Sequence, residues 1–104
     1  MIFCDVETLS LHSPLLSIQW AKGFERPKIH FVWEEDVEDT LELMAELTED
    51  TVVMWNGVFD WFHISKWYNI FSEYYDRFGG GSPNPYTAWK IEHERPAGYV
   101  SELS

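Results

Sequence analysis

Two short acidic motifs each follow an apolar stretch of the chain. Asp5 and Glu7 close the stretch that begins at Met1, and Asp60 comes shortly after the β-branched stretch 51–55. Side chains alternate along a strand, so Asp5 and Glu7 are expected on one face. If the two stretches are neighbouring parallel strands, all three carboxylates lie near one edge of a sheet, where ligands of α/β proteins bind.

Three carboxylates held this close resist joint ionisation, and they form the oxygen-rich ligand set that Mg²⁺ and Mn²⁺ prefer. Two such ions can clamp the attacking and leaving oxygens of a phosphodiester. We therefore predict that Asp5, Glu7 and Asp60 are metal ligands and catalytic residues, with Mg²⁺ or Mn²⁺ as the cofactor. In the structural alternative, Asp5 and Glu7 are solvated acids at a strand end. Asp60 then stabilises a helix dipole by about 0.3–1 kcal/mol.

The pattern of apolar residues predicts the elements that must position these acids. The pattern predicts strands over residues 1–7, 15–22 and 28–33. Because the connections between them are short, we expect an antiparallel meander. A helix over 36–47 is long enough to cross over and bring strand 51–55 back parallel to strand 1–7. Asn56 is expected to cap a second helix, which runs to about residue 75. The predicted fold class is α/β with a mixed sheet.

A Gly/Pro-rich loop follows this core, beginning at residue 78. Residues 86–104 show weak periodicity and contain Pro96 and Gly98. We therefore expect a core domain over 1–77 and a loop with a weakly structured tail over 78–104.

Composition bounds the classes of function. The 104 residues suffice for one small domain, and no apolar run reaches the roughly 20 residues of a membrane helix. Cys4 is the single cysteine, which leaves no internal disulfide and no cysteine-built zinc site. We expect a cytoplasmic protein without membrane contact.

A net charge of −11 with only seven Lys and Arg opposes tight binding to nucleic acid. Either a nucleic acid touches a small metal-loaded patch, or other chains supply the basic groove, or nucleic acid is not a ligand.

The two acidic motifs also resemble those of a known family. The segment 2–8, an apolar strand ending in Asp-Val-Glu-Thr, resembles the first motif of the DEDD 3′–5′ exonucleases. The segment 56–60, Asn-Gly-Val-Phe-Asp, resembles their second motif. The tripeptide Asp-Val-Glu alone is unspecific, because it recurs at 36–38 at a predicted helix start. The resemblance covers residues 1–75 and is closest to the N-terminal proofreading domain of phage-type family A DNA polymerases.

This resemblance implies a ribonuclease H-like fold and a two-ion site that hydrolyses the 3′ end of single-stranded DNA. Asp5, Glu7 and Asp60 correspond to the family's metal ligands. Thr8 and Asn56 become candidate substrate-binding residues, Asn56 beside its role as a helix cap. A phage-encoded chain would act in the host cytoplasm.

The chain departs from the family in one respect. The third motif, Tyr-x-x-x-Asp or His-x-x-x-x-Asp, is missing, since no Asp occurs after Asp76. We therefore expect a truncated piece, one half of a split nuclease, or a relative that has lost activity. The isolated chain should cleave weakly or not at all.

Aromatic residues crowd the predicted second helix on more than one face. Phe62, Trp67 and Tyr74 lie largely off the stripe formed by Trp61, Ile64, Tyr68, Phe71 and Tyr75. A helix that is apolar on several faces is buried on several faces. We therefore expect a partner surface here, for the rest of a polymerase, another protein or a second copy of this chain. An alternative function follows, a non-catalytic acidic interaction module that binds a protein, for instance as a DNA mimic.

Overall fold

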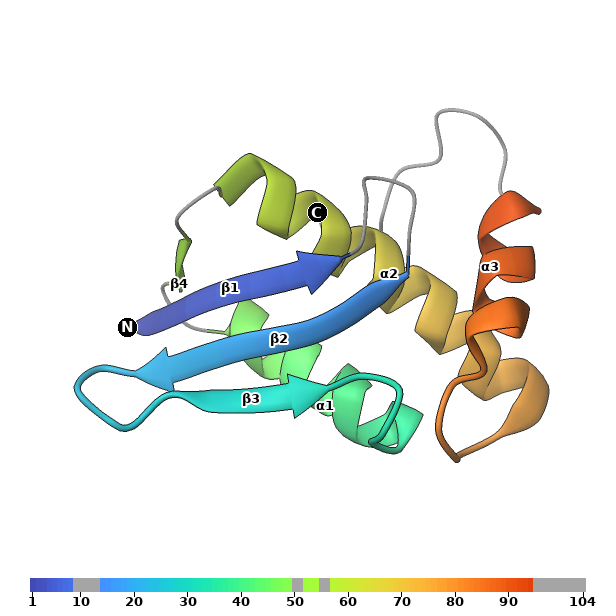
Figure 1. Cartoon of the computed structure of the whole chain (residues 1–104), viewed down its shortest axis with the longest axis horizontal. Coiled ribbons are helices and arrows are strands. Elements are labelled where there is room, and N and C mark those ends of the chain that lie inside the picture. Colours follow the sequence, from blue (N-terminus) through green and yellow to red (C-terminus); the bar gives the residue numbers. More distant parts are fainter. Residues whose placement is uncertain (9–13, 50–51, 55–56, 95–104) are drawn as a thin grey trace.

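A computed structural model describes residues 1–8, 14–49, 52–54 and 57–94. In this part of the chain it shows a small α/β domain with a mixed four-stranded sheet and three helices (Figure 1). The elements, in chain order, are β1 (Ile2–Thr8), β2 (Leu15–Lys22), β3 (Lys28–Phe31), α1 (Val37–Thr48), β4 (Val52–Met54), α2 (Gly57–Phe78) and α3 (Pro85–His93).

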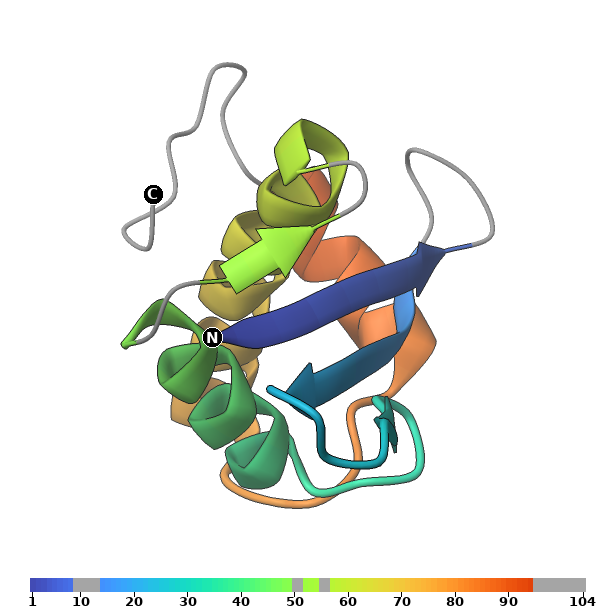
Figure 2. The ribbon, with the colours of Figure 1, turned by 90° about the vertical axis from the view of Figure 1, so that its left-hand side faces the viewer.

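The sheet has the strand order β3-β2-β1-β4. β1 pairs antiparallel with β2, and β2 pairs antiparallel with β3, which confirms the predicted meander. β4 pairs with β1 in the parallel direction, and Figure 2 shows the two arrows side by side with the same heading. β3 is shorter than predicted, because the chain turns after Phe31 through a hydrogen bond from Glu34 N to Phe31 O of 3.1 Å.

The helices α1 and α2 cover one face of the sheet (Figures 1 and 2). The strand side chains that point toward them are buried, and alternation leaves every second residue of β1 exposed. Full burial of one such apolar side chain stabilises the fold by about 1.5–3 kcal/mol. The core between the layers contains Ile2, Cys4, Val6, Leu15, Ile18, Val37, Met44, Leu47, Ile64, Trp67, Ile70 and Phe71.

The start of α1 is tied to the loop that follows α2. The Asp36 carboxylate accepts hydrogen bonds from Glu38 N at 2.9 Å and from Gly81 N at 2.7 Å. Val37 N in turn donates to Gly81 O at 2.9 Å. Gly81 has φ of 99°, a left-handed conformation that glycine adopts without a steric penalty. The second Asp-Val-Glu copy, at 36–38, is therefore a helix cap.

The tail predicted to be weakly structured contains the helix α3, which corrects the expected boundary after residue 77. Asn84 caps the helix through its side chain, and Pro85 occupies the first turn. Ala88 and Ile91 are buried against the rest of the domain. The sequence prediction failed because so short a helix presents only two buried residues, too few for a visible period. Residues 95–104 lie outside the described part of the chain.

Salt bridges reinforce the packing of α3 on α2. Lys66 pairs with Glu92, and Arg77 pairs with Glu94 at 2.9 Å. Across the described ranges, no helix is both long and apolar enough to cross a membrane.

Candidate functional site

The first two predicted site residues lie on the sheet face that α1 and α2 leave uncovered. Asp5 and Glu7 are both exposed and alternate with the buried residues Cys4 and Val6. One Asp5 carboxylate oxygen accepts a hydrogen bond from Val6 N at 3.0 Å. Both acids are therefore accessible to an ion or a partner from solvent.

The third predicted site residue, Asp60, lies in the first turn of α2 and is only 1% exposed. It lies within electrostatic reach of Cys4. Burial raises the pKa of the Cys4 thiol to about 12, with further contributions first from Asp60 and then from Asp5. Asp5 and Asp60 thus influence the same buried thiol, one from the open face of the sheet and the other from a buried position on α2.

At the carboxyl edge of the neighbouring strands β1 and β4, Asp5 and Glu7 therefore lie on the open face, whereas Asp60 is buried in the first turn of α2. Within the described ranges, no group of three His, Cys, Asp or Glu side chains is placed to hold a metal ion. The donor chemistry fits Mg²⁺ or Mn²⁺, since all three groups are carboxylates. The arrangement offers two accessible carboxylates and one buried carboxylate.

Of the two predicted substrate-binding residues, the structure describes Thr8 but not Asn56. Thr8 ends β1 and is partly buried, and the pairing register with β2 shifts between Glu7 and Thr8. Such bulges re-aim side chains and are common next to active sites. Asn56 lies outside the described residues, so its expected roles as cap and substrate contact stay predictions.

The histidine nearest in sequence to Asp60 is enclosed by aromatic rings. His63 is 0% exposed, and its ring centroid lies 4.4 Å from that of Phe59 and 5.4 Å from that of Phe62. Burial at this level keeps the imidazole away from solvent. His63 is therefore a residue of α2 that is buried in the interior of the domain.

The predicted need for a partner on α2 is met in part by this chain itself. Trp67 is 0% exposed and Tyr74 is 9% exposed. The Tyr74 hydroxyl donates to Ser82 O at 3.3 Å, in the loop that leads to α3. Phe62, by contrast, is half exposed. Trp67 and Tyr74 need no second chain to cover them.

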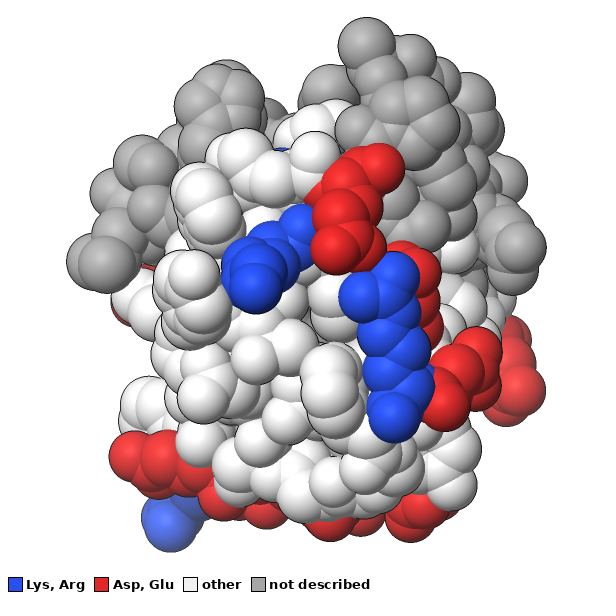
Figure 3. Space-filling view, turned by 90° about the vertical axis from the view of Figure 1, so that its right-hand side faces the viewer, with Lys and Arg blue, Asp and Glu red and all other residues white. Residues whose placement is uncertain are grey.

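Exposed aromatic side chains remain around the far end of α2 and along α3. Phe78, Tyr86 and Trp89 are 58%, 66% and 43% exposed. Figure 3 shows this side of the molecule as a largely uncharged surface with a few Lys, Arg, Asp and Glu side chains. Tyr86 and Trp89 stack nearly parallel, with ring centroids 6.3 Å apart.

The open sheet face is the uncovered side of the sheet that carries Asp5 and Glu7, and the sequence alone did not predict it. Apolar side chains stand beside the two acids there. They come from three strands and are each 42–56% exposed, namely Phe3, Ile29, Phe31 and Val53. The alternation of Phe3, Asp5 and Glu7, and that of Ile29 and Phe31, was the available signal, but alternation does not say which face a helix covers.

A separate hollow of about 580 Å³ lies beside the edge strand β4. Its lining comes from the end of α1, from β4 and from the start of α2, and includes the apolar side chains of Leu47, Met54 and Trp61. None of the three site carboxylates lines it. It is therefore distinct from the acidic edge.

Comparison with protein-family models, with curated proteins and with solved structures found no match for this chain.

Proposed function

We propose that this chain is the N-terminal part of a metal-dependent 3′–5′ exonuclease domain of ribonuclease H-like type, as in the proofreading domain of a phage-like DNA polymerase. In this proposal Asp5, Glu7 and Asp60 hold Mg²⁺ or Mn²⁺, and the substrate is the 3′ end of single-stranded DNA. The ions would supply a metal-activated water and stabilise the leaving oxygen.

The strongest support for the proposal is the parallel pairing of β1 with β4. β1 and β4 are parallel neighbours, so the segment that carries Asp5 and Glu7 ends at the same edge as the strand that leads to Asp60. The ligand-binding edge of α/β sheets is this carboxyl edge. The influence of Asp60 and Asp5 on the Cys4 thiol is consistent with that proximity.

The same geometry limits the expected activity. Asp5 and Glu7 can meet an ion from solvent, whereas Asp60 is only 1% exposed. A third motif is missing from the sequence. We therefore expect weak metal binding by this chain, and weak cleavage or none.

A metal-dependent melting experiment tests the proposal. Mn²⁺ should raise the melting temperature of the parent chain, because a ligand that binds only the folded state stabilises it by about 2.7 kcal/mol at 100 times its Kd. Asp5→Asn and Glu7→Gln should each reduce or abolish the rise. Both side chains are exposed, so these variants should fold normally.

Glu42→Gln is the matched control, because Glu42 is an exposed acid on α1, away from the sheet edge. It should keep the full Mn²⁺ response. The proposal fails if the parent chain shows no rise, or if Glu42→Gln loses as much of the response as Asp5→Asn does.

A second assay separates a metal-binding relative from an active nuclease. The chain is incubated with Mn²⁺ and a 5′-labelled single strand, either DNA or RNA, and the shortened products are resolved by length. Products that shorten from the 3′ end and disappear with Asp5→Asn support an active domain. Metal binding without products supports an inactive relative or a split nuclease. In the split case, adding the polypeptide that carries the missing Asp should create activity.

A second candidate function is favoured by the open sheet face. Phe3, Ile29, Phe31 and Val53 are exposed there beside two acids, a combination that suits a protein partner with apolar and basic side chains. A nucleic-acid-binding protein whose basic groove accepts a DNA mimic is one such partner. Under this candidate Asp5→Ala is neutral or stabilising, since it removes repulsion from Glu7, and Mn²⁺ has no effect on melting.

A further inference from the structure

The β2–β3 hairpin tip, residues 22–28, has a charge opposite to that of the rest of the molecule. It contains three of the seven Lys and Arg residues, Lys22, Arg26 and Lys28, against one acid, Glu25. Its formal charge is +2, whereas the whole chain carries −11, which leaves −13 on the remainder. A polyanion would be repelled by most of this protein and attracted here.

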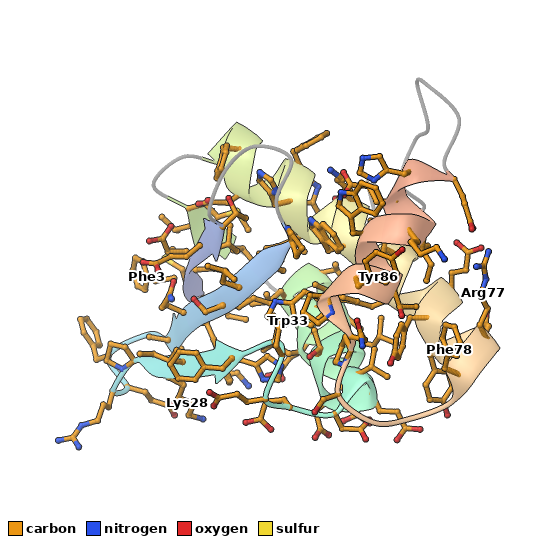
Figure 4. All side chains as sticks on the ribbon, turned by 45° about the vertical axis from the view of Figure 1, so that its right-hand side comes forward. Phe3, Lys28, Trp33, Arg77, Phe78 and Tyr86 are labelled. Atoms are coloured by element: carbon orange, nitrogen blue, oxygen red, sulfur yellow. The ribbon has the colours of Figure 1, made fainter. Side chains whose placement is uncertain are left out.

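Two of these cations are available to a ligand. Across the described part of the chain, neither Arg26 nor Lys28 has a salt-bridge partner, while Lys22 is paired with Glu46 of α1. Lys28 Nζ lies 4.7 Å from the centroid of the Trp20 ring, which holds this side chain beside the hairpin. Figure 4 shows Lys28 at the opposite side of the molecule from Arg77, which forms salt bridges with Glu73 and Glu94.

The hairpin tip also carries an aromatic side chain, two residues before Arg26. Phe24 is fully exposed, at 110% of its reference area, the highest value among the exposed large apolar side chains of the described residues. The turn that presents it is ordered by hydrogen bonds from Gly23 N to Met1 O and from Glu25 N to Lys22 O, both 2.9 Å. A single exposed apolar residue needs no explanation by itself. The combination with two available cations does suggest a ligand.

We propose that the hairpin tip binds single-stranded nucleic acid, with a base stacked on Phe24 and phosphates held by Arg26 and Lys28. Aromatic rings and cations along one surface are the elements that bind single strands without sequence preference. A single strand fits better than a duplex, because the faces of duplex bases are already stacked on one another. The carboxylates of an acidic protein would use the cations, but they have no ring face that could stack on Phe24.

The hairpin tip and the acidic edge lie at opposite ends of β1. Lys22 is the pairing partner of Ile2, whereas Glu7 lies near the other end of the strand. Glu7 is five residue steps along the strand from Ile2, which corresponds to about 17 Å. Binding at the tip does not depend on the carboxylates.

Fluorescence anisotropy of a labelled oligothymidylate of about 12 nucleotides tests the proposal on the full chain, with a chelator present to exclude metal. The parent should bind at low salt, and two phosphate contacts predict a slope of about −1.4 in log K against log salt. Phe24→Ala should weaken binding roughly 5- to 150-fold. Arg26→Ala and Lys28→Ala should each reduce the slope by about 0.7.

Matched controls come from α3. Lys90→Ala removes an exposed cation and Tyr86→Ala removes an exposed aromatic ring, and both should bind as the parent does. Because the chelator removes metal from the binding assay, the hairpin proposal is tested separately from the nuclease proposal, which is tested by Mn²⁺ and melting. Circular dichroism confirms that each variant is folded.

The proposal is overturned if the parent does not bind, if Phe24→Ala binds as the parent does, or if the α3 controls lose as much affinity. Equal binding of duplex and single strand removes the role of Phe24 as a stacking platform. Equally strong competition by polyglutamate reassigns the tip to an acidic protein. If sedimentation shows a parent dimer that Phe24→Ala converts to a monomer, the tip is instead a contact between two copies of this chain.

Discussion

Cys4 of β1 lies opposite Met54 of β4 in a parallel strand pair. This register places the residues that follow Cys4 and those that follow Met54 at the same edge of the sheet. It also brings the Cys4 thiol within reach of the carboxylates of Asp60 and Asp5, which contribute to a pKa of about 12. Cys4 is therefore a buried reporter of the candidate site.

The first prediction concerns the reactivity of that thiol. Cys4 should react slowly with a thiol reagent in mildly alkaline buffer and quickly in urea, because the thiolate is the reactive form and burial disfavours it. Asp60→Asn should lower the apparent pKa seen in the pH dependence of labelling, and Asp5→Asn should lower it less. Glu7→Gln is the control, because Glu7 does not contribute to the shift. An equal effect of Glu7→Gln would contradict the proximity of Asp60 and Cys4.

The second prediction concerns the packing of α3. Ile91→Ala should reduce the free energy of unfolding by about 2–5 kcal/mol, because Ile91 is 1% exposed and its removal leaves a cavity. Urea denaturation measures the change. Lys90→Ala, at the neighbouring exposed position, should stay within about 0.5 kcal/mol of the parent. Similar stability of Ile91→Ala and Lys90→Ala would show that α3 is not part of the core.

The third prediction concerns Asp36, which joins the start of α1 to Gly81. Asp36→Asn should keep the cap to Glu38 N and lose the bond from Gly81 N, whereas Asp36→Ala should lose both. The melting temperature should therefore fall in the order parent, Asp36→Asn, Asp36→Ala. Asp39→Asn, at a nearby exposed acid, should lower it less.

The same carboxylate should give a pH-dependent difference. The hydrogen bonds from Glu38 N and Gly81 N lower the pKa of Asp36 below its usual value of 3.8. A lowered folded pKa means that the carboxylate stabilises the fold at neutral pH and stops doing so as pH falls through that pKa. The melting-temperature gap between the parent and Asp36→Ala should therefore narrow in acid. A constant gap would show that the carboxylate form is not needed.

The fourth prediction concerns His30, whose Nε2 lies 2.7 Å from Thr40 Oγ1 and so links β3 to α1. Burial lowers the pKa of His30 below 6.5, against the opposing effects of Glu35 and Asp39. The unfolded chain then binds a proton more readily, so this contribution to stability is complete above about pH 6.5 and is lost as pH falls below it. His30→Gln should flatten the stability profile between pH about 7.5 and 5.5.

His93→Gln is the matched control for the fourth prediction, because it removes an exposed imidazole from α3. Urea midpoints across this pH range measure both variants. If His93→Gln flattens the profile as much as His30→Gln does, the dependence does not come from the β3–α1 link.

Most of the fold could be predicted from the sequence, because its signals are local. The alternation over 2–8 and 15–22 and the apolar stripe of α1 each require only neighbouring residues. The crossover length of α1 then made parallel pairing of β4 with β1 the natural arrangement, and the structure confirms it. The helix α3 was missed because its evidence is tertiary. Its two buried residues, Ala88 and Ile91, are recognisable only once α2 lies against them.

The sequence by itself determined which residue types reach the acidic edge and that Asp5 and Glu7 share a face. Only the tertiary structure decided which face that is. Both helices pack on the other side of the sheet, because Ile2, Cys4 and Val6 bury more apolar area there than the alternate residues could, and this leaves Asp5 and Glu7 exposed while Asp60 is buried. The positive charge of the hairpin tip follows from the sequence of residues 22–28. Its exposure at the end of the sheet depends on the pairing of β2 with β3.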